Sequence, residues 1–251
     1  MNIEIKRDGL TLRGELLRPN NEKSPLAVIF HGLMSSIGYD DEHLFKKLAN
    51  RLLEYGIASV RFDFNGHGKS DGLFSDMTVY GELLDASKIM DYVRGLDFVT
   101  DIYIAGHSQG GLVGGMTAGY YRDIIKKLVL LAPASTIKSD ALKGDCFGQT
   151  YDTVNVPERI VLYDLEHKAY DVGSFYLRTA KTLPIYETTA MFEGPTLIIH
   201  GTLDPAVSYH ASEEYHKVLK NSELVLLEGE NHGLDEFSLY ETIERVCRFL
   251  K

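Results

Sequence analysis

The sequence has few cysteines, no long hydrophobic run and no excess of positive charge. Its two cysteines, Cys146 and Cys247, form neither a metal-binding spacing nor a disulfide framework, and we expect Cys247 to be a small buried residue on the last helix. No segment approaches the ~20 consecutive apolar residues that a membrane helix needs, and residues 1–8 lack the apolar core of a signal peptide. We therefore expect a cytoplasmic protein with no membrane partner, an expectation that a removed leader would overturn.

Positive charge is scarce as well. Lysine and arginine together number 26 and aspartate and glutamate 36, which gives a formal net charge of −10 at pH 7. Because no basic stripe offsets this charge, a polyanion would be repelled, and we expect no nucleic-acid partner. No pair of histidines has metal-ligand spacing together with a third ligand, so the sequence predicts neither a metal site nor a metal hydrolase.

The hydrophobic pattern alternates between the strand period and the helix period along most of the chain. A hairpin signal surrounds Asp8-Gly9, and apolar runs typical of strands buried on both faces follow it. The predicted strands are 26–30, 57–64, 101–105, 127–132, 195–200 and 223–227, and the predicted helices are 44–55, 78–96, 109–120, 208–219 and 236–250. In the last helix, Tyr240 is expected to face inward. This order predicts an α/β fold with a mostly parallel eight-stranded sheet and helices on both faces.

One segment interrupts this alternation. Residues 134–193 contain no clean strand–helix unit but many tyrosines, and the alternation resumes at about residue 194. A structureless stretch of ~60 residues is uncommon inside a compact domain. We interpret residues 134–193 as a cap inserted over the carboxyl edge of the sheet, where ligands of open α/β sheets bind. Residues 1–133 and 194–251 would then form the core.

The motif Gly106-His107-Ser108-Gln109-Gly110 follows the predicted strand 101–105 and begins a glycine-rich helix. A Gly-x-Ser-x-Gly sequence in this context is typical of a nucleophile elbow, in which a strained turn exposes the serine hydroxyl. The small residues on either side let neighbouring chain segments pass. The motif therefore predicts Ser108 as a catalytic nucleophile.

A nucleophilic serine needs a base, and the chain has nine histidines. In hydrolases with this elbow, an acid and then the histidine follow the serine along the chain. Four histidines precede Ser108, and four others lie in the insert, at a strand end or inside a helix: His31, His43, His67, His107, His167, His200, His210 and His216. His232 remains, in a loop after a strand. Asp204, in the loop after the preceding strand, is the predicted acid; Asp235 is the weaker rival, and Asp204 could instead be a turn residue before Pro205.

Two backbone N–H groups are expected to stabilise the oxyanion. One belongs to Gln109, directly after the nucleophile, and the other to Leu33, in the loop after the strand 26–30. Gly32 allows a tight turn there. His31 either braces this loop or is a structural histidine.

These motifs resemble those of the α/β-hydrolases, and more closely those of the bacterial cinnamoyl and feruloyl esterases. The matching features run along nearly the whole chain: Phe30-His31-Gly32, residues 61–72, residues 97–103, residues 106–111, Phe175-Tyr176-Leu177-Arg178, and His200-Gly201 with Asp204. The elbow and its partners are common to the whole superfamily. The insert segment is the more specific part of the resemblance.

The resemblance implies that a small cap holds a flat hydroxycinnamoyl group and that polar cap side chains reach its ring hydroxyls. On this basis Asp140 and Tyr176 are the candidate contacts, although Asp140 could cap a short helix and Tyr176 could be part of the cap's core. Phe147 stands where a polar residue would be expected in this family. That departure leaves the preferred ring substitution open.

The sequence thus predicts a serine carboxylesterase that hydrolyses feruloyl, caffeoyl, coumaroyl or chlorogenate-type esters without a cofactor. The alternatives are a monoacylglycerol lipase-like or generic short-chain carboxylesterase and a peptidase of the same fold, which would need an anchor for a charged amine. A non-catalytic ligand-binding relative is the alternative from another class. The alcohol half of the ester and the oligomeric state stay open, with a homodimer as one arrangement.

Overall fold

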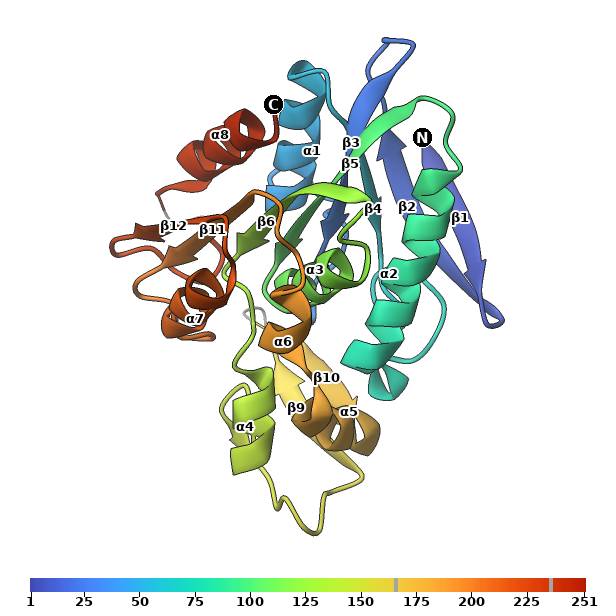
Figure 1. Cartoon of the computed structure of the whole chain (residues 1–251). Coiled ribbons are helices and arrows are strands. Elements are labelled where there is room, and N and C mark those ends of the chain that lie inside the picture. The colour runs from blue at the N-terminus through green and yellow to red at the C-terminus, as the bar shows by residue number, and fades with distance from the viewer. Residues whose placement is uncertain (165–166, 235–236) are drawn as a thin grey trace.

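A computed structural model describes residues 1–164, 167–234 and 237–251. Its central feature is an eight-stranded sheet in the order β1-β2-β4-β3-β5-β6-β11-β12 (Figure 1). The strands are β1 (Asn2–Arg7), β2 (Leu10–Leu17), β3 (Ser24–Phe30), β4 (Ala58–Phe62), β5 (Val99–His107), β6 (Ile125–Leu131), β11 (Thr196–Gly201) and β12 (Ser222–Leu227). β2 pairs antiparallel with β1 and β4, and the remaining pairs are parallel. The predicted mostly parallel eight-stranded sheet is confirmed.

Helices cover both faces of the sheet. α1 (Leu44–Glu54) and α8 (Leu239–Leu250) contact each other on one face, and α2 (Val79–Arg94), α3 (Gln109–Tyr120) and α7 (His210–Val218) pack on the other. Side chains alternate along β3: Val28 and Phe30 enter the core under α2 and α3, whereas Ala27 and Ile29 enter the core under α1 and α8. The continuous apolar run in this strand is therefore explained by burial on both faces.

The last helix begins at Leu239, later than the predicted residue 236, and one of its residues faces another way than expected. Cys247 is fully buried, as expected, but Tyr240 is 73% exposed, so the expectation that it faces inward was wrong. The buried stripe of α8 consists of Thr242, Ile243, Val246, Cys247 and Leu250. Tyr240 lies outside the angular range of this stripe, and the Nζ of Lys47 stacks over its ring instead.

The segment expected to form a cap leaves the sheet after β6 and returns at β11. Its elements are α4 (Ile137–Lys143), β7 (Asp145–Cys146), β8 (Gln149–Thr150), β9 (Arg159–Tyr163), β10 (Ala169–Gly173), α5 (Ser174–Thr179), the 3-10 turn η2 (Ala180–Thr182) and α6 (Ile185–Thr189). Figure 1 shows α4, β9, β10 and α5 projecting together from one end of the molecule. A second 3-10 turn, η1 (Phe74–Asp76), contacts β10 from the core. None of the helices described is both long and apolar enough to span a membrane.

The last helix of this segment packs back onto the core. A side chain at Gly119 of α3 would place its Cβ 2.0 Å from the backbone oxygen of Thr188, and one at Gly115 would lie 2.9 Å from the Oγ1 of Thr189. Glycine at both positions therefore allows α6 to lie directly against α3. The division into a core (1–133 and 194–251) and a cap (134–193) remains a proposal, since α6 is joined to the cap by sequence but to the core by packing.

Candidate active site

Ser108 occupies a strained turn between β5 and α3. Its φ of 55° and ψ of −126° lie in a region that non-glycine residues seldom adopt. The neighbouring glycines explain how the turn is accommodated: a Cβ at Gly106 would lie 2.2 Å from the backbone oxygen of Gly110, and a Cβ at Gly110 would lie 2.3 Å from that of His31. These close approaches hold the serine at the carboxyl edge of the sheet.

The structure brings the three residues predicted for the chemistry together. His232, in the loop after β12, has its Nε2 2.9 Å from the Oγ of Ser108 and its Nδ1 2.6 Å from the Oδ2 of Asp204. Asp204 comes from the loop after β11. This hydrogen-bonded chain has the order and geometry of a serine–histidine–acid triad. The rival acid, Asp235, lies outside the described residues.

Asp204 is held by four hydrogen bonds. Its Oδ1 accepts the N–H groups of Ala206 and Val207, both at 2.8 Å, and its Oδ2 accepts His200 as well as His232. Burial of the carboxylate opposes ionisation, but the hydrogen bonds from the two histidines prevail and lower the pKa of Asp204 below its usual range. The carboxylate is therefore fixed in place and ionised.

Sequence reasoning missed the role of His200 in this arrangement. His200 is fully buried, and its Nε2 donates to the Oδ2 of Asp204 at 2.9 Å, while the Oγ of Ser212 lies 2.7 Å from its Nδ1. Its position at the end of β11, four residues before the acid, was the available signal. His200 therefore supplies a second imidazole donor to the same oxygen of Asp204 that bonds to His232.

His107, the residue before Ser108, supports the loop that carries His232. Its Nε2 donates to the backbone oxygen of His232 at 2.7 Å, and the two imidazole centroids are 4.9 Å apart. Burial, assisted by the neighbouring His232, lowers the pKa of His107 to about 3. His107 thus stays neutral and adds no positive charge beside the base.

The two predicted oxyanion donors lie beside the serine. Gln109 is the first residue of α3, where helix N–H groups have no intrahelical acceptor. A Cβ at Gly32 would lie 2.9 Å from the Cβ of Ser108, so the Gly32–Leu33 segment passes directly along the nucleophile. Leu33 also lines the adjoining cavity. Their function as oxyanion donors remains a prediction.

His31 holds the peptide that carries the Leu33 N–H. Its Nε2 accepts the N–H of Phe64 at 3.0 Å, so its Nδ1 carries the hydrogen and donates to the backbone oxygen of Gly32 at 2.8 Å. Because the Gly32 carbonyl and the Leu33 N–H belong to one planar peptide and point in opposite directions, this bond turns the N–H away from His31. Of the two interpretations left open for His31, the contacts favour the brace. Burial lowers its pKa to about 4, which keeps it neutral.

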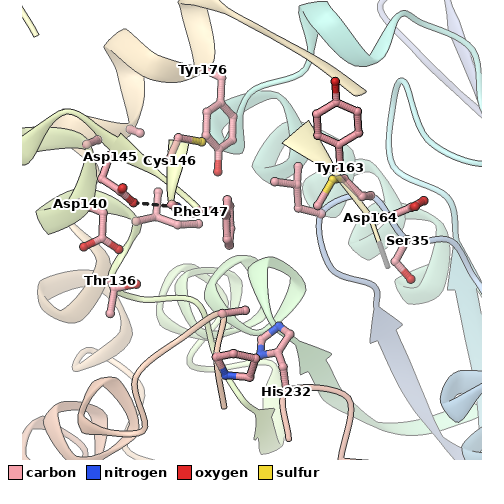
Figure 2. A pocket seen from close by; sticks show the side chains of 18 of the residues that line it. Ser35, Thr136, Asp140, Asp145, Cys146, Phe147, Tyr163, Asp164, Tyr176 and His232 are labelled. Carbon is pink, nitrogen blue, oxygen red and sulfur yellow. Dashed lines mark hydrogen bonds between the residues drawn. The ribbon is translucent and has the colours of Figure 1, made fainter. Parts of the chain in front are cut away.

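A cavity of about 840 Å³ lies between the core and the cap, with His232 in its wall. Figure 2 shows Asp140, Asp145 and Thr136 on one side, Tyr163, Asp164 and Ser35 on the other, and Phe147 and Tyr176 between them, opposite His232. Asp140 and Tyr176 therefore both line the cavity, as expected. As far as the residues described go, the lining includes three aspartates but no lysine or arginine.

The hydroxyl of Tyr176 has a partner within the protein. It donates to the Oε1 of Gln109 at 2.7 Å, and the side chain is 2% exposed. A contact between this hydroxyl and a substrate ring therefore remains a prediction. The sequence analysis did not single out Asp145, Tyr163 or Asp164, which lie at the ends of short cap strands without a motif to mark them. In the described part of the chain, no group of three or more metal-ligating side chains is gathered.

Comparison with known families identifies the class of protein. The family model described as "Serine aminopeptidase, S33" matches residues 21–150, and one described as "TAP-like protein" matches residues 176–243. The chain therefore belongs to the α/β-hydrolase superfamily, in the family that the first of these models describes. It is similar to the AB hydrolase superfamily protein YisY of Bacillus subtilis, with 26% identity over 231 residues covering 81% of this chain and 83% of that protein.

Among solved structures, the chain is similar to Est1E from Butyrivibrio proteoclasticus with ferulic acid bound. The TM-score is 0.92 and the identity 38%, over 99% of this chain and 97% of that one. A monoacylglycerol lipase from Paleococcus ferrophilus, at 18% identity and a TM-score of 0.73 over 95% and 98% of the two chains, shares the fold. The resemblance inferred from the sequence motifs is thus confirmed over nearly the whole chain, and the protein is an α/β-hydrolase.

Proposed function

We propose that this protein is a serine carboxylesterase that hydrolyses small hydroxycinnamoyl esters (feruloyl, caffeoyl, coumaroyl or chlorogenate-type) through an acyl-enzyme. The observation that carries the proposal is the chain from Ser108 through His232 to Asp204, which opens on a cavity covered by the cap. The similarity to Est1E, whose structure contains ferulic acid, supports an aromatic acyl group.

The chemistry follows from the positions of the side chains. Ser108 attacks the ester carbonyl while the Nε2 of His232 takes its proton, and the ionised Asp204 stabilises the resulting imidazolium. The N–H groups of Leu33 and Gln109 stabilise the oxyanion. His232 then protonates the departing alcohol, and a water activated by the same histidine releases the acid. No step needs a cofactor.

The cavity accounts for the proposed choice of acyl group. Its volume is in the range typical of small-molecule sites, and Phe147 and Tyr176 offer flat surfaces to an aromatic ring. Asp140 accepts a hydrogen bond from a ring hydroxyl, and the oxygen of Tyr176, although its hydrogen is directed at Gln109, keeps lone pairs that can accept another. Carboxylates without facing lysines or arginines also favour a neutral ester over its anionic acid product.

A second candidate function is aminopeptidase or arylamidase activity. No sequence motif marks an anchor for a charged amine, yet Asp140 and Asp145 lie together on one side of the cavity (Figure 2). Two carboxylates can bind an ammonium group. This interpretation also agrees with the description of the matching family model. The two functions differ in whether the aspartates bind a ring hydroxyl or a cation.

A substrate panel distinguishes these functions. We expect kcat/KM to be highest for methyl caffeate and methyl ferulate, lower for methyl cinnamate, p-nitrophenyl butyrate and a monoacylglycerol, and negligible for aminoacyl p-nitroanilides. Ser108→Ala is the control for background hydrolysis. A preference for aminoacyl p-nitroanilides would establish the second function, and a preference for the monoacylglycerol would establish a lipase. The expectations of a cytoplasmic location and a homodimer stay predictions.

A further inference from the structure

A buried chain of hydrogen bonds joins the cap to the nucleophile elbow. The hydroxyl of Tyr176 on α5 donates to the Oε1 of Gln109 at 2.7 Å, and the Nε2 of Gln109 donates to the Oε2 of Glu82 on α2 at 2.9 Å. The three side chains are 2%, 0% and 1% exposed. Three separate elements therefore meet at the side chain of the residue that follows Ser108.

This arrangement fixes the side chain of Gln109 at both ends. A carboxamide has one accepting and one donating end, and here the first is held by Tyr176 and the second by Glu82. Rotation of the side chain would leave buried polar atoms without partners, which is costly in a dry interior. Since Gln109 begins α3, a fixed side chain also limits how far its own backbone can turn.

The hydrogen bond between Gln109 and Glu82 requires the burial of a carboxyl group, which is energetically unfavourable. Burial raises the pKa of Glu82 well above its usual range, an effect that the neighbouring Asp85 increases and the bond from Gln109 opposes. A leucine of similar size would avoid this cost if the position served only to fill space between α2 and α3. Buried hydrogen bonds between defined donors and acceptors instead specify one arrangement.

We propose that Tyr176 and Glu82 are positioning residues that clamp the side chain of Gln109 and so hold its backbone N–H toward the oxyanion. This inference rests on the proposed ester hydrolysis. It gives Tyr176 a role in the reaction of every substrate, whereas a contact with a ring hydroxyl would affect hydroxylated substrates alone. A residue of the cap, Tyr176, thereby helps to position an oxyanion donor, the Gln109 N–H, that belongs to the core.

Kinetics of matched tyrosine variants test the clamp. Tyr176→Phe removes the donor, and Tyr186→Phe on α6 is the control, because it removes a hydroxyl that lies 2.8 Å from the Oγ of Ser135 and Tyr186 is not among the residues that line the cavity. We expect Tyr176→Phe to lower kcat on the order of tenfold for p-nitrophenyl butyrate and methyl caffeate alike, less than the ~10²–10³ lost with an oxyanion donor itself. KM should change little, and Tyr186→Phe should behave as the native protein. A loss confined to methyl caffeate, or no loss, would overturn the proposal.

Substitutions at Glu82 test the other end of the clamp. Glu82→Gln keeps an oxygen that can accept from Gln109, whereas Glu82→Leu removes it. We expect Glu82→Leu to reproduce the loss of kcat on p-nitrophenyl butyrate and Glu82→Gln to retain most of the activity. Equal activity of the two variants would show that the side chain of Glu82 only fills space. Thermal unfolding of each variant distinguishes a loss of activity caused by misfolding from one caused by a displaced Gln109.

A spectroscopic measurement does not depend on turnover. The chain contains two glutamines, Gln109 and the exposed Gln149 on β8, so selective ¹⁵N-glutamine labelling yields one reporter and one internal reference. We expect Tyr176→Phe and Glu82→Leu to shift or broaden the backbone and side-chain N–H signals of Gln109 and to leave those of Gln149 in place. Unchanged Gln109 signals in both variants would overturn the clamp even in an active esterase. Shifted signals in a protein that hydrolyses no ester would overturn the proposed function instead.

Discussion

The two sides of the cavity are built in different ways. On the core side, Leu33, Ser108, Asp204 and His232 all lie within five residues after the end of a parallel strand. On the cap side, Asp140 sits on a seven-residue helix and Asp145 on a two-residue strand. Sheet topology therefore fixes the residues proposed for the chemistry, whereas side-chain packing holds the residues proposed for recognition. We expect changes in the core to affect all substrates and changes at the recognition residues of the cap, such as Asp140, to affect some; Tyr176, which contacts the core residue Gln109, is the expected exception in the cap.

The largest expected effect comes from the chain of three residues. Ser108→Ala and His232→Ala should each lower kcat by roughly 10⁴-fold or more on every substrate, with similar losses because the residues act as a unit, and Asp204→Asn by about 10⁴-fold. Steady-state kinetics with methyl caffeate and p-nitrophenyl butyrate measure this. Asp235→Asn is the control for the acid. If Asp204→Asn keeps a near-native kcat while Asp235→Asn loses most of its kcat, the acid is misassigned.

A smaller core effect is expected at the loop beside the nucleophile. In Gly32→Ala the new Cβ would lie 2.9 Å from the Cβ of Ser108, so the loop must move and displace the Leu33 N–H. We expect kcat to fall by about 10² on all substrates with little change in KM. Gly95→Ala is the matched control, because a Cβ there meets only backbone oxygens, the nearer being that of Tyr92 at 3.4 Å. A native kcat in Gly32→Ala would argue against an oxyanion donor at Leu33.

We expect acidic pH to lower the free energy of unfolding because of three buried histidines in the core. Burial lowers the pKa of His31 to about 4 and, for His67 and His107, to about 3, from an ordinary value of 6.5. Below pH 6.5 the unfolded chain therefore binds protons that the folded chain does not, and the free energy of unfolding falls as the pH is lowered. Each such histidine contributes a slope of at most about 1.4 kcal/mol per pH unit down to its folded pKa.

Replacing one of these histidines tests the predicted dependence of unfolding free energy on pH. The Nε2 of His67 has no hydrogen-bond partner among the residues described, and its ring packs against Phe74 and His31. We expect His67→Phe to reduce the dependence of unfolding free energy on pH by about 1.4 kcal/mol per unit between pH 6 and 4, measured by urea denaturation. If plots of unfolding free energy against pH run parallel for the native protein and His67→Phe, the prediction is contradicted.

The smallest effect is expected in the cap, and for selected substrates only. Asp140→Asn removes the charge that strengthens a hydrogen bond to a ring hydroxyl, worth about 1.5–3 kcal/mol. We expect kcat/KM for methyl caffeate to fall about tenfold and that for methyl cinnamate to stay within about twofold. Equal losses on both esters would mean that Asp140 maintains the cap. No loss on either would remove Asp140 from the proposed ring site.

What could be predicted from the sequence follows the same division. The strand–helix alternation and the order of Ser108, Asp204 and His232 are carried by local patterns and by chain order, so both could be inferred from the residues alone. The partners of these residues could not. The only signal for His200 was its position four residues before Asp204, and Glu82 contacts Gln109 from 27 positions away, which no spacing rule marks.

The cap shows most clearly which features could not be predicted from the sequence. Strands of two residues, such as β7, bury too little to leave a period in the sequence, so residues 134–193 could be recognised only as an interruption. Tyr176 was singled out through the resemblance, but its hydrogen bond to Gln109 depends on how α5 docks on the elbow. Tyr240 shows a different limit, because its apolar character suggested burial that the geometry of α8 does not provide.

The packing of α6 against α3 has a consequence for protein engineering. Because Gly115 and Gly119 receive Thr188 and Thr189, the end of the insert is locked to a core helix. A chimera that takes its cap from a relative should therefore be joined before Pro184, which precedes α6, and not at residue 194. The exchangeable module is then 134–183. A graft that carries a foreign α6 would need side chains that fit against Gly115 and Gly119 of α3.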